Sequence, residues 1–117
     1  MVNFLTIERR EISKLIAEIN GRVFMGFYDD ARYPQHAERV WIKATLYCPT
    51  DGEYEGQEWY SPFNDSFIYS QIKKHGLCVD ARKEITVVKF EHESEMMTIK
   101  NKEQDVAILL AVIAKNA

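Results

Sequence analysis

The side chains with the clearest potential for chemistry are four closely spaced carboxylates, those of Asp51, Glu53, Glu55 and Glu58. Two carboxylates can act as general acid and general base when their environments push their pKa values apart. A flexible polar connection would instead leave all four solvated and ionised, because water favours the charged form. We therefore interpret this group as a charged surface and not as a catalytic pair.

The three histidines, His36, His75 and His92, are not spaced with other ligand types as a compact metal motif requires. His92 stands between Glu91 and Glu93, but on a strand the neighbours of a residue point to the opposite face. Surface decoration is the better interpretation of this triplet. We predict no metal site.

The two cysteines, Cys48 and Cys78, lie 30 positions apart and form no C-x-x-C motif. In a cytosolic protein this spacing predicts free, partly buried thiols and not a disulfide. A thiol–imidazole pair of Cys78 with His75 would need the end of a helix and the start of a strand to converge. The chain also lacks a glycine-rich phosphate loop, and Ser61 lacks the G-x-S-x-G frame of a nucleophile elbow. We predict no enzymatic activity and no cofactor.

The charge distribution is more informative. No Lys or Arg lies between Lys43 and Lys73, and residues 44–72 carry five acidic side chains. This interval therefore has a net charge of −5, which leaves +2 for the rest of a chain whose total is −3. Aromatic residues are interleaved with the acids. Acidic side chains steer association with basic partners, and exposed Tyr and Trp anchor protein interfaces.

The chemistry of this interval predicts a partner-binding surface. Its candidate residues are Asp51, Glu53, Tyr54, Glu55, Glu58, Trp59 and Tyr60. The alternative is a solvated loop that Trp59 and Phe63 attach to the core. A second candidate is the mixed-charge segment 29–36, which contains Asp29, Asp30, Arg32 and Tyr33. This segment could bind a small ligand, or it could be a plain connection.

The N-terminal half must position these candidates. Apolar residues at Ile12, Leu15, Ile16 and Ile19 predict a helix over 7–19, capped by Thr6 and ended by Asn20-Gly21. Strands follow over 22–28 and 38–48, and the second has clear period-two alternation. A polar connection is expected over 50–58, with a short returning strand at 59–60.

The C-terminal half predicts a helix over 65–75 that ends at Gly76, and strands over 77–81, 84–92 and 96–100. A last helix over 102–115 is expected to begin at a cap on Asn101, with Gln104 at its third position. Its apolar side is so broad that it predicts either a buried terminal helix or contact with a second copy in a homodimer.

We therefore predict an α+β fold over a single domain, residues 1–117. One antiparallel sheet of four to five strands is sandwiched by helices, in the order α-β-β-α-β-β-β-α. The chain has 117 residues, enough to form a core without disulfides or metal.

The N-terminus lacks the apolar run of a signal peptide, and no window approaches the length of a membrane span. We expect a cytoplasmic protein that does not bind membranes. Its mild acidity argues against direct nucleic-acid binding, which depends on clustered Lys and Arg.

The C-terminal half resembles small bacteriophage and prophage proteins of the phage ABA-sandwich type. The residues that carry the resemblance are Trp59-Tyr60-Ser61-Pro62, Asn64-Asp65, the helix through Ile72, the strands of 77–100 and the apolar run 106–111. The resemblance implies a helix/sheet/helix sandwich and a phage accessory protein located in the host cytoplasm. It implies no catalytic residue.

These observations favour a non-enzymatic, phage-type protein that binds a host protein with a basic surface and inhibits it or a defence complex. The alternative is an oligomeric, nucleotide-sequestering or other small-ligand-binding protein that uses a basic pocket built from Arg9, Arg10, Arg22 or Arg32. A small enzyme has the least support, since no nucleophile, base or metal set converges in the sequence.

Overall fold

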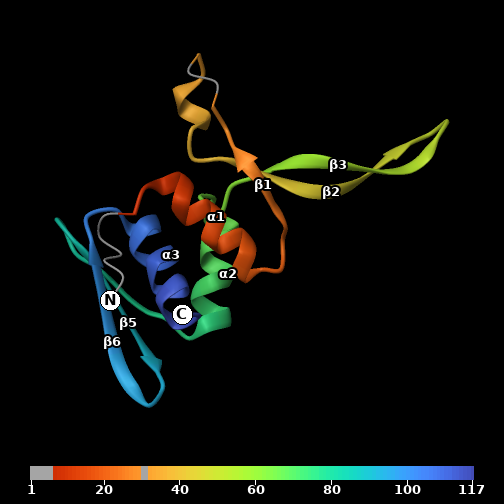
Figure 1. Cartoon of the computed structure of the whole chain (residues 1–117). Helices are drawn as coiled ribbons and strands as arrows, with labels where there is room; N and C mark the ends of the chain where they lie inside the picture. The colour runs from red at the N-terminus through yellow and green to blue at the C-terminus, as the bar shows by residue number, and fades with distance from the viewer. Residues whose placement is uncertain (1–6, 30–31) are drawn as a thin grey trace. The chain divides into compact units, whose positions relative to one another are not determined.

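In the part of the chain that the computed structural model describes, two three-stranded antiparallel sheets and three α-helices are present. Figure 1 shows the path of the chain through these elements. The structure describes residues 7–29 and 32–117. The predicted α+β class with antiparallel strands is confirmed. The prediction of one sheet with four to five strands is wrong, because among the described residues β1–β3 form one sheet and β4–β6 form another.

The described residues divide into two compact units, one within residues 9–61 and the other formed by residues 7–8 and 62–117. The predicted single domain over 1–117 stays a prediction. Within the described residues, no helix is both long enough and apolar enough to cross a membrane.

The unit 9–61 contains one helix and the first sheet. Its elements in chain order are α1 (Arg9–Ile19), β1 (Phe24–Phe27), the 3-10 helix η2 (Pro34–His36), β2 (Val40–Cys48) and β3 (Gly52–Tyr60). The strand order is β1-β2-β3, so β2 is central. The observed order therefore has three full strands before the second α-helix, where the prediction had two.

Helix α1 forms where the apolar spacing predicts it and packs on β1 and β2. Ala17 lies in a core cluster with Val40 and Ile42, and Phe24, Phe27 and Tyr60 pack against this cluster. The helix ends at Ile19, before the predicted Asn20-Gly21 stop. The predicted cap, Thr6, lies outside the described residues.

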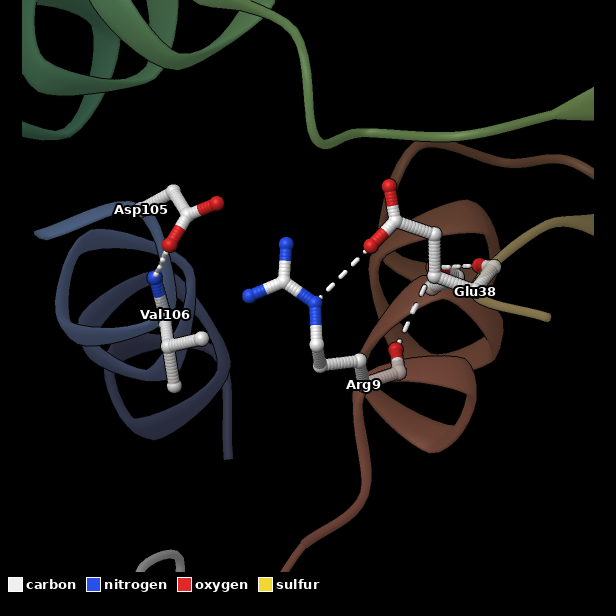
Figure 2. Close-up of polar contacts among 5 residues, drawn as sticks. Arg9, Glu38, Asp105 and Val106 are labelled. Atoms are coloured by element: carbon white, nitrogen blue, oxygen red, sulfur yellow. Dashed lines mark hydrogen bonds and ion pairs between the residues drawn. The ribbon is translucent and has the colours of Figure 1, made fainter. Parts of the chain in front are cut away.

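Two side chains of α1 form hydrogen bonds with Glu38, which lies two residues before β2. The fully buried Ser13 hydroxyl lies 2.5 Å from the Glu38 carbonyl oxygen and donates to it. Arg9 Nε donates to a Glu38 carboxylate oxygen at 2.8 Å, as Figure 2 shows. A buried hydroxyl needs such a partner because its desolvation is otherwise uncompensated.

The other unit contains the second sheet, whose strands lie between α2 and α3 in the sequence. Its elements are α2 (Asp65–His75), β4 (Cys78–Ala81), β5 (Thr86–His92), β6 (Glu95–Asn101) and α3 (Gln104–Lys115). The strand order is β4-β5-β6, with both pairs antiparallel. Helix α3 packs on β5 and β6 and against α2.

Helix α3 is buried over nine consecutive residues, 106–114. This burial explains its broad apolar surface and agrees with the prediction of a buried terminal helix. The predicted cap on Asn101 is wrong. Asn101 is the last residue of β6, and its side-chain oxygen accepts from the Glu103 amide at 2.9 Å, so it forms a turn before the helix and Glu103 is the N-cap residue.

Helix α2 has the predicted limits, because local signals define both ends. The Asn64 side chain accepts from the Phe67 amide at 2.9 Å and caps the N-terminus. Gly76 ends the helix with φ +62°, a left-handed conformation that side chains with a Cβ disfavour.

Two exposed positions in this unit have a left-handed backbone conformation, and substitutions there should change the free energy of unfolding in opposite directions. Gly76 has φ +62° and open space where a Cβ would stand, whereas Ser94 in the β5–β6 turn has φ +67° without being glycine. Gly76→Ala should lower the free energy of unfolding by roughly 1 kcal/mol, and Ser94→Gly should raise it by a similar amount. Urea denaturation of both variants measures these changes in the free energy of unfolding. If both variants were stabilised, or both destabilised, the positive φ angles at Gly76 and Ser94 would be contradicted.

Candidate partner-binding surface

The acidic segment is a strand, and the prediction of a polar loop over 50–58 is wrong. Strand β3 pairs with β2 over its whole length, from Val40 opposite Tyr60 to Cys48 opposite Gly52. A turn over residues 49–51 joins the strands, and Gly52 follows it with φ +78°. The adjacent strand overrides the low strand propensity of Gly and Glu, because β-propensity depends strongly on context.

The pairing register assigns each side chain of this hairpin to one of two faces, because opposite residues of an antiparallel pair share a face. One face, which we call the acidic face, carries Trp41, Lys43, Thr45 and Tyr47 of β2, and Glu53, Glu55, Gln57 and Trp59 of β3. The other face, the core face, carries the remaining residues of the two strands. Near β1 the core face contains the buried Val40 and Ile42.

The seven predicted partner-binding residues are therefore divided by the structure. Glu53, Glu55 and Trp59 lie on the acidic face, and Asp51 lies in the turn. Tyr54, Glu58 and Tyr60 lie on the core face. Tyr60 packs against the core cluster, and this burial raises the pKa of its hydroxyl while the positive charge of Arg22 opposes the shift.

An aromatic cluster surrounds Trp59 on the acidic face at the base of the hairpin. Its ring centroid lies 5.1 Å from Trp41, 5.1 Å from Tyr28 and 5.3 Å from His36. The Arg39 guanidinium lies 4.8 Å from the Trp59 ring centroid. Although it is enclosed on these sides, Trp59 remains 40% exposed. A rigid, partly exposed Trp is the residue type that most often anchors a protein interface.

The second predicted candidate, the segment 29–36, reaches the same cluster. The Tyr33 ring lies 6.1 Å from His36, and Arg32 stacks over Tyr33 at 5.6 Å. His36 also contributes a buried Nδ1 atom without a hydrogen-bond partner among the described residues. The structure thus brings two segments together at Trp59 that sequence analysis treated separately. Asp29 forms an ion pair with Arg10, and Asp30 lies outside the described residues.

The acidic residues of the hairpin differ in how far they are neutralised. Glu58 pairs with Arg22, and Glu55 pairs with Lys43 at 3.0 Å. Within residues 7–29 and 32–117, Asp51 and Glu53 form no ion pair. Exposed pairs contribute little to stability, so Glu55 remains available to another cation. The excess negative charge is therefore concentrated at the far end of the hairpin.

Several residues of this surface are absent from the predicted candidates. Tyr47 is 73% exposed opposite Glu53, and Trp41 and Tyr28 contact Trp59. Trp41, Lys43, Thr45 and Tyr47 stand at alternate positions of the predicted strand 38–48, and this alternation was the signal that they share a face that is partly covered or part of a binding surface. The contact with Tyr28 depends on the chain returning through β1, which no local pattern encodes.

The alternative function, binding of a small ligand, would need the predicted arginines to form one basic pocket, but each of them has its own contacts. Arg9 pairs with Glu38, Arg10 with Asp29 and Arg22 with Glu58, while Arg32 lies over Tyr33. In the described residues they form ion pairs and ring contacts of their own. This arrangement gives no support to a basic pocket that would attract a phosphate.

Other potential sites have simpler explanations. A hollow of about 300 Å³ lies beside α2 and α3, and its two carboxylates belong to Asp65 and Asp105. Both stand in the first turn of their helices, where negative charge is favourable, and Asp105 accepts from the Val106 amide at 2.8 Å (Figure 2). In the described part of the chain, no three His, Cys, Asp or Glu side chains gather as a metal site requires.

Comparison of the chain with protein-family models, curated proteins and solved structures finds no match. The resemblance to phage ABA-sandwich proteins therefore stays a prediction. The assignment of this surface depends on its geometry and charge.

The Cys48 thiol at the tip of the hairpin gives a direct test of the turn geometry. Its sulfur lies 3.2 Å from the Thr50 hydroxyl, and this hydrogen bond, with backbone amides of Asp51 and Thr50, lowers the pKa of the thiol. A lower pKa gives more thiolate at neutral pH and faster alkylation. In the Cys78→Ser protein, the rate of iodoacetamide modification should rise at lower pH than it does in the denatured chain.

Thr50→Ala supplies the control for this measurement. It removes the principal donor to the thiolate, so the inflection of the pH–rate profile should move to higher pH. An unchanged profile would show that the turn does not hold Thr50 beside the sulfur.

Proposed function

We propose that the protein is a non-enzymatic binding protein whose acidic face engages a basic surface on a partner protein. The proposal is based on one observation. The exposed side chains of Glu53, Glu55 and Tyr47 lie on the same face of the hairpin as Trp59 and its aromatic cluster. Charges of one sign steer a basic partner, and the partly exposed Trp supplies apolar contact at the base.

The shape of the sheet supports this use. Strand β1 pairs only with the first part of β2, from Val40 to Ile42, and the Lys43 amide makes the last bond in that direction, to the Val23 carbonyl. Beyond Lys43, β2 and β3 have no other strand beside them within the described ranges. The acidic-face side chains there are exposed, while those of the core face are half-buried or exposed, so a partner can reach the acidic face without displacing the core.

The phage context remains part of the proposal. The resemblance of the C-terminal half to phage accessory proteins suggests that the partner is a bacterial host enzyme or defence complex, which binding would inhibit. An acidic face of this kind could occupy a basic groove that otherwise holds nucleic acid, because both ligands would present negative charge to the same side chains.

Charge reversal on the acidic face tests the proposal. The partner is first captured from bacterial lysate with the wild-type protein and identified by mass spectrometry. Its affinity for purified wild-type protein and for Glu53→Lys/Glu55→Lys is then measured at low and high salt. We expect the variant to bind about tenfold more weakly or worse, with a flatter salt dependence, because attraction becomes repulsion.

The matched control is Glu91→Lys/Glu95→Lys, which changes the net charge equally at exposed positions in the β5–β6 hairpin. This control should bind like the wild type. Circular dichroism should show that both variants are folded. Equal affinity of the two charge-reversed proteins would reject the acidic face as the binding surface.

A further inference from the structure

Among residues 7–29 and 32–117, no strand lies beside the outer edge of β3. Strand β2 lies on one side, and the sheet ends at β3 on the other. An exposed edge presents a row of backbone donors and acceptors that can pair with another strand. Proteins that bind extended peptides use such edges, with backbone bonds giving affinity and alternate side chains giving specificity.

The register identifies which backbone groups face outward. The Lys43 amide donates toward β1, to the Val23 carbonyl, so the N–H and C=O of Lys43 point away from β3. Lys43 is opposite Gln57, and in a regular antiparallel ladder such a pair makes no bond across the strands. The outward groups of β3 therefore belong to Gln57 and, at period two, to Glu55 and Glu53.

The side chains beside these backbone groups define the chemistry of a matching strand. Glu53 and Glu55 project from the acidic face, and between them Tyr54 projects from the core face with 51% of its surface exposed. Side chains on adjacent strands lie about 5 Å apart and pair directly. A matching strand would place Lys or Arg beside the two glutamates and an apolar residue beside Tyr54.

We propose that the β3 edge at Glu53, Glu55 and Gln57 accepts an extended basic segment of a partner protein as an additional strand. This inference rests on the proposed function and specifies its binding mode. The partner segment alternates basic and apolar residues, so that its cations meet the acidic face while its apolar side chains cover Tyr54.

Charge also argues against two other arrangements: pairing of β3 with a second copy of itself, and binding of the basic segment at the edge of β2. A second copy of β3 would bring its own Glu53 and Glu55 to the same edge, and like charges on adjacent strands repel. The outer edge of β2 beyond Lys43 exposes the backbone of Thr45 and Tyr47, which offer no charge to a basic segment. It is also the shorter of the two edges, because β1 covers its first part.

The experiment uses a short synthetic peptide of alternating Lys and Val as the probe. Its affinity is measured by fluorescence anisotropy at low salt, and hydrogen exchange of the protein amides is followed by NMR. We expect exchange at the Glu53, Glu55 and Gln57 amides to slow by about tenfold or more, because pairing protects outward donors. The Thr45 and Tyr47 amides should be unaffected.

Two control peptides separate strand pairing from charge attraction. One has the same composition with its lysines grouped at one end, and the other is N-methylated at alternate amides, which removes the bonding edge and keeps the charge. Both should bind at least several-fold more weakly and protect none of the three amides. Because these controls use the wild-type protein, they do not depend on whether a hairpin variant folds.

The outcomes distinguish this inference from the function on which it rests. Equal binding of the N-methylated peptide, protection of Thr45 and Tyr47 in place of the β3 amides, or no binding would each overturn edge pairing. If the captured partner still requires Glu53 and Glu55, the acidic face remains a binding surface of another kind. If that requirement is also absent, the proposed function fails as well.

Discussion

The uninterrupted pairing of β2 with β3 is the constraint on which the unit 9–61 depends. Nine consecutive cross-strand pairs assign every side chain of residues 40–48 and 52–60 to one of the two faces. At the base, α1 and β1 pack on this hairpin and bury Val40 and Ile42. Toward the tip the strands have only each other. A two-stranded ribbon is marginally stable in water, so the outer part depends on its own cross-strand contacts and on the anchored base.

Those contacts divide between the two faces. On the core face, Leu46 lies opposite Tyr54 and also covers Gly56, where an added Cβ would collide with its side chain. On the acidic face, Lys43 and Glu55 form an exposed ion pair that adds little stability. The apolar contacts thus hold the ribbon together, while the exposed charges add little to its stability. Loss of the Lys43–Glu55 ion pair would therefore lower the stability of the hairpin only slightly.

The elements with local signals could be predicted from the sequence, and the pairing of strands could not. Helix α2 has its predicted limits because Asn64 and Gly76 are defined by bonds within a few residues. The division into two sheets depends on which strands meet, a choice made by packing between distant segments. Strand β3 was missed because its Gly and Glu residues are typical of loops, and its strand conformation comes from β2 beside it.

The candidate site shows the same division. Composition alone located the acidic and aromatic segment, since clustered charge is visible without any structure. It could not divide the segment between faces, because treating 50–58 as a loop discarded the period of two that separates Glu53 and Glu55 from Tyr54 and Glu58. The neighbours of Trp59 could not be predicted either, because Tyr28 and His36 reach it from distant parts of the chain.

The contacts of Trp59 join the two candidate segments into one surface. Its ring meets His36 from the connection between β1 and β2, and it belongs to the strand that carries Glu53 and Glu55. A partner that covers the acidic face up to Trp59 therefore also meets the segment that holds Tyr33 and His36. The ring contacts therefore make the segment that holds Tyr33 and His36 part of the same surface as Trp59. The mixed-charge connection is better understood as the rim of this surface than as a separate ligand site.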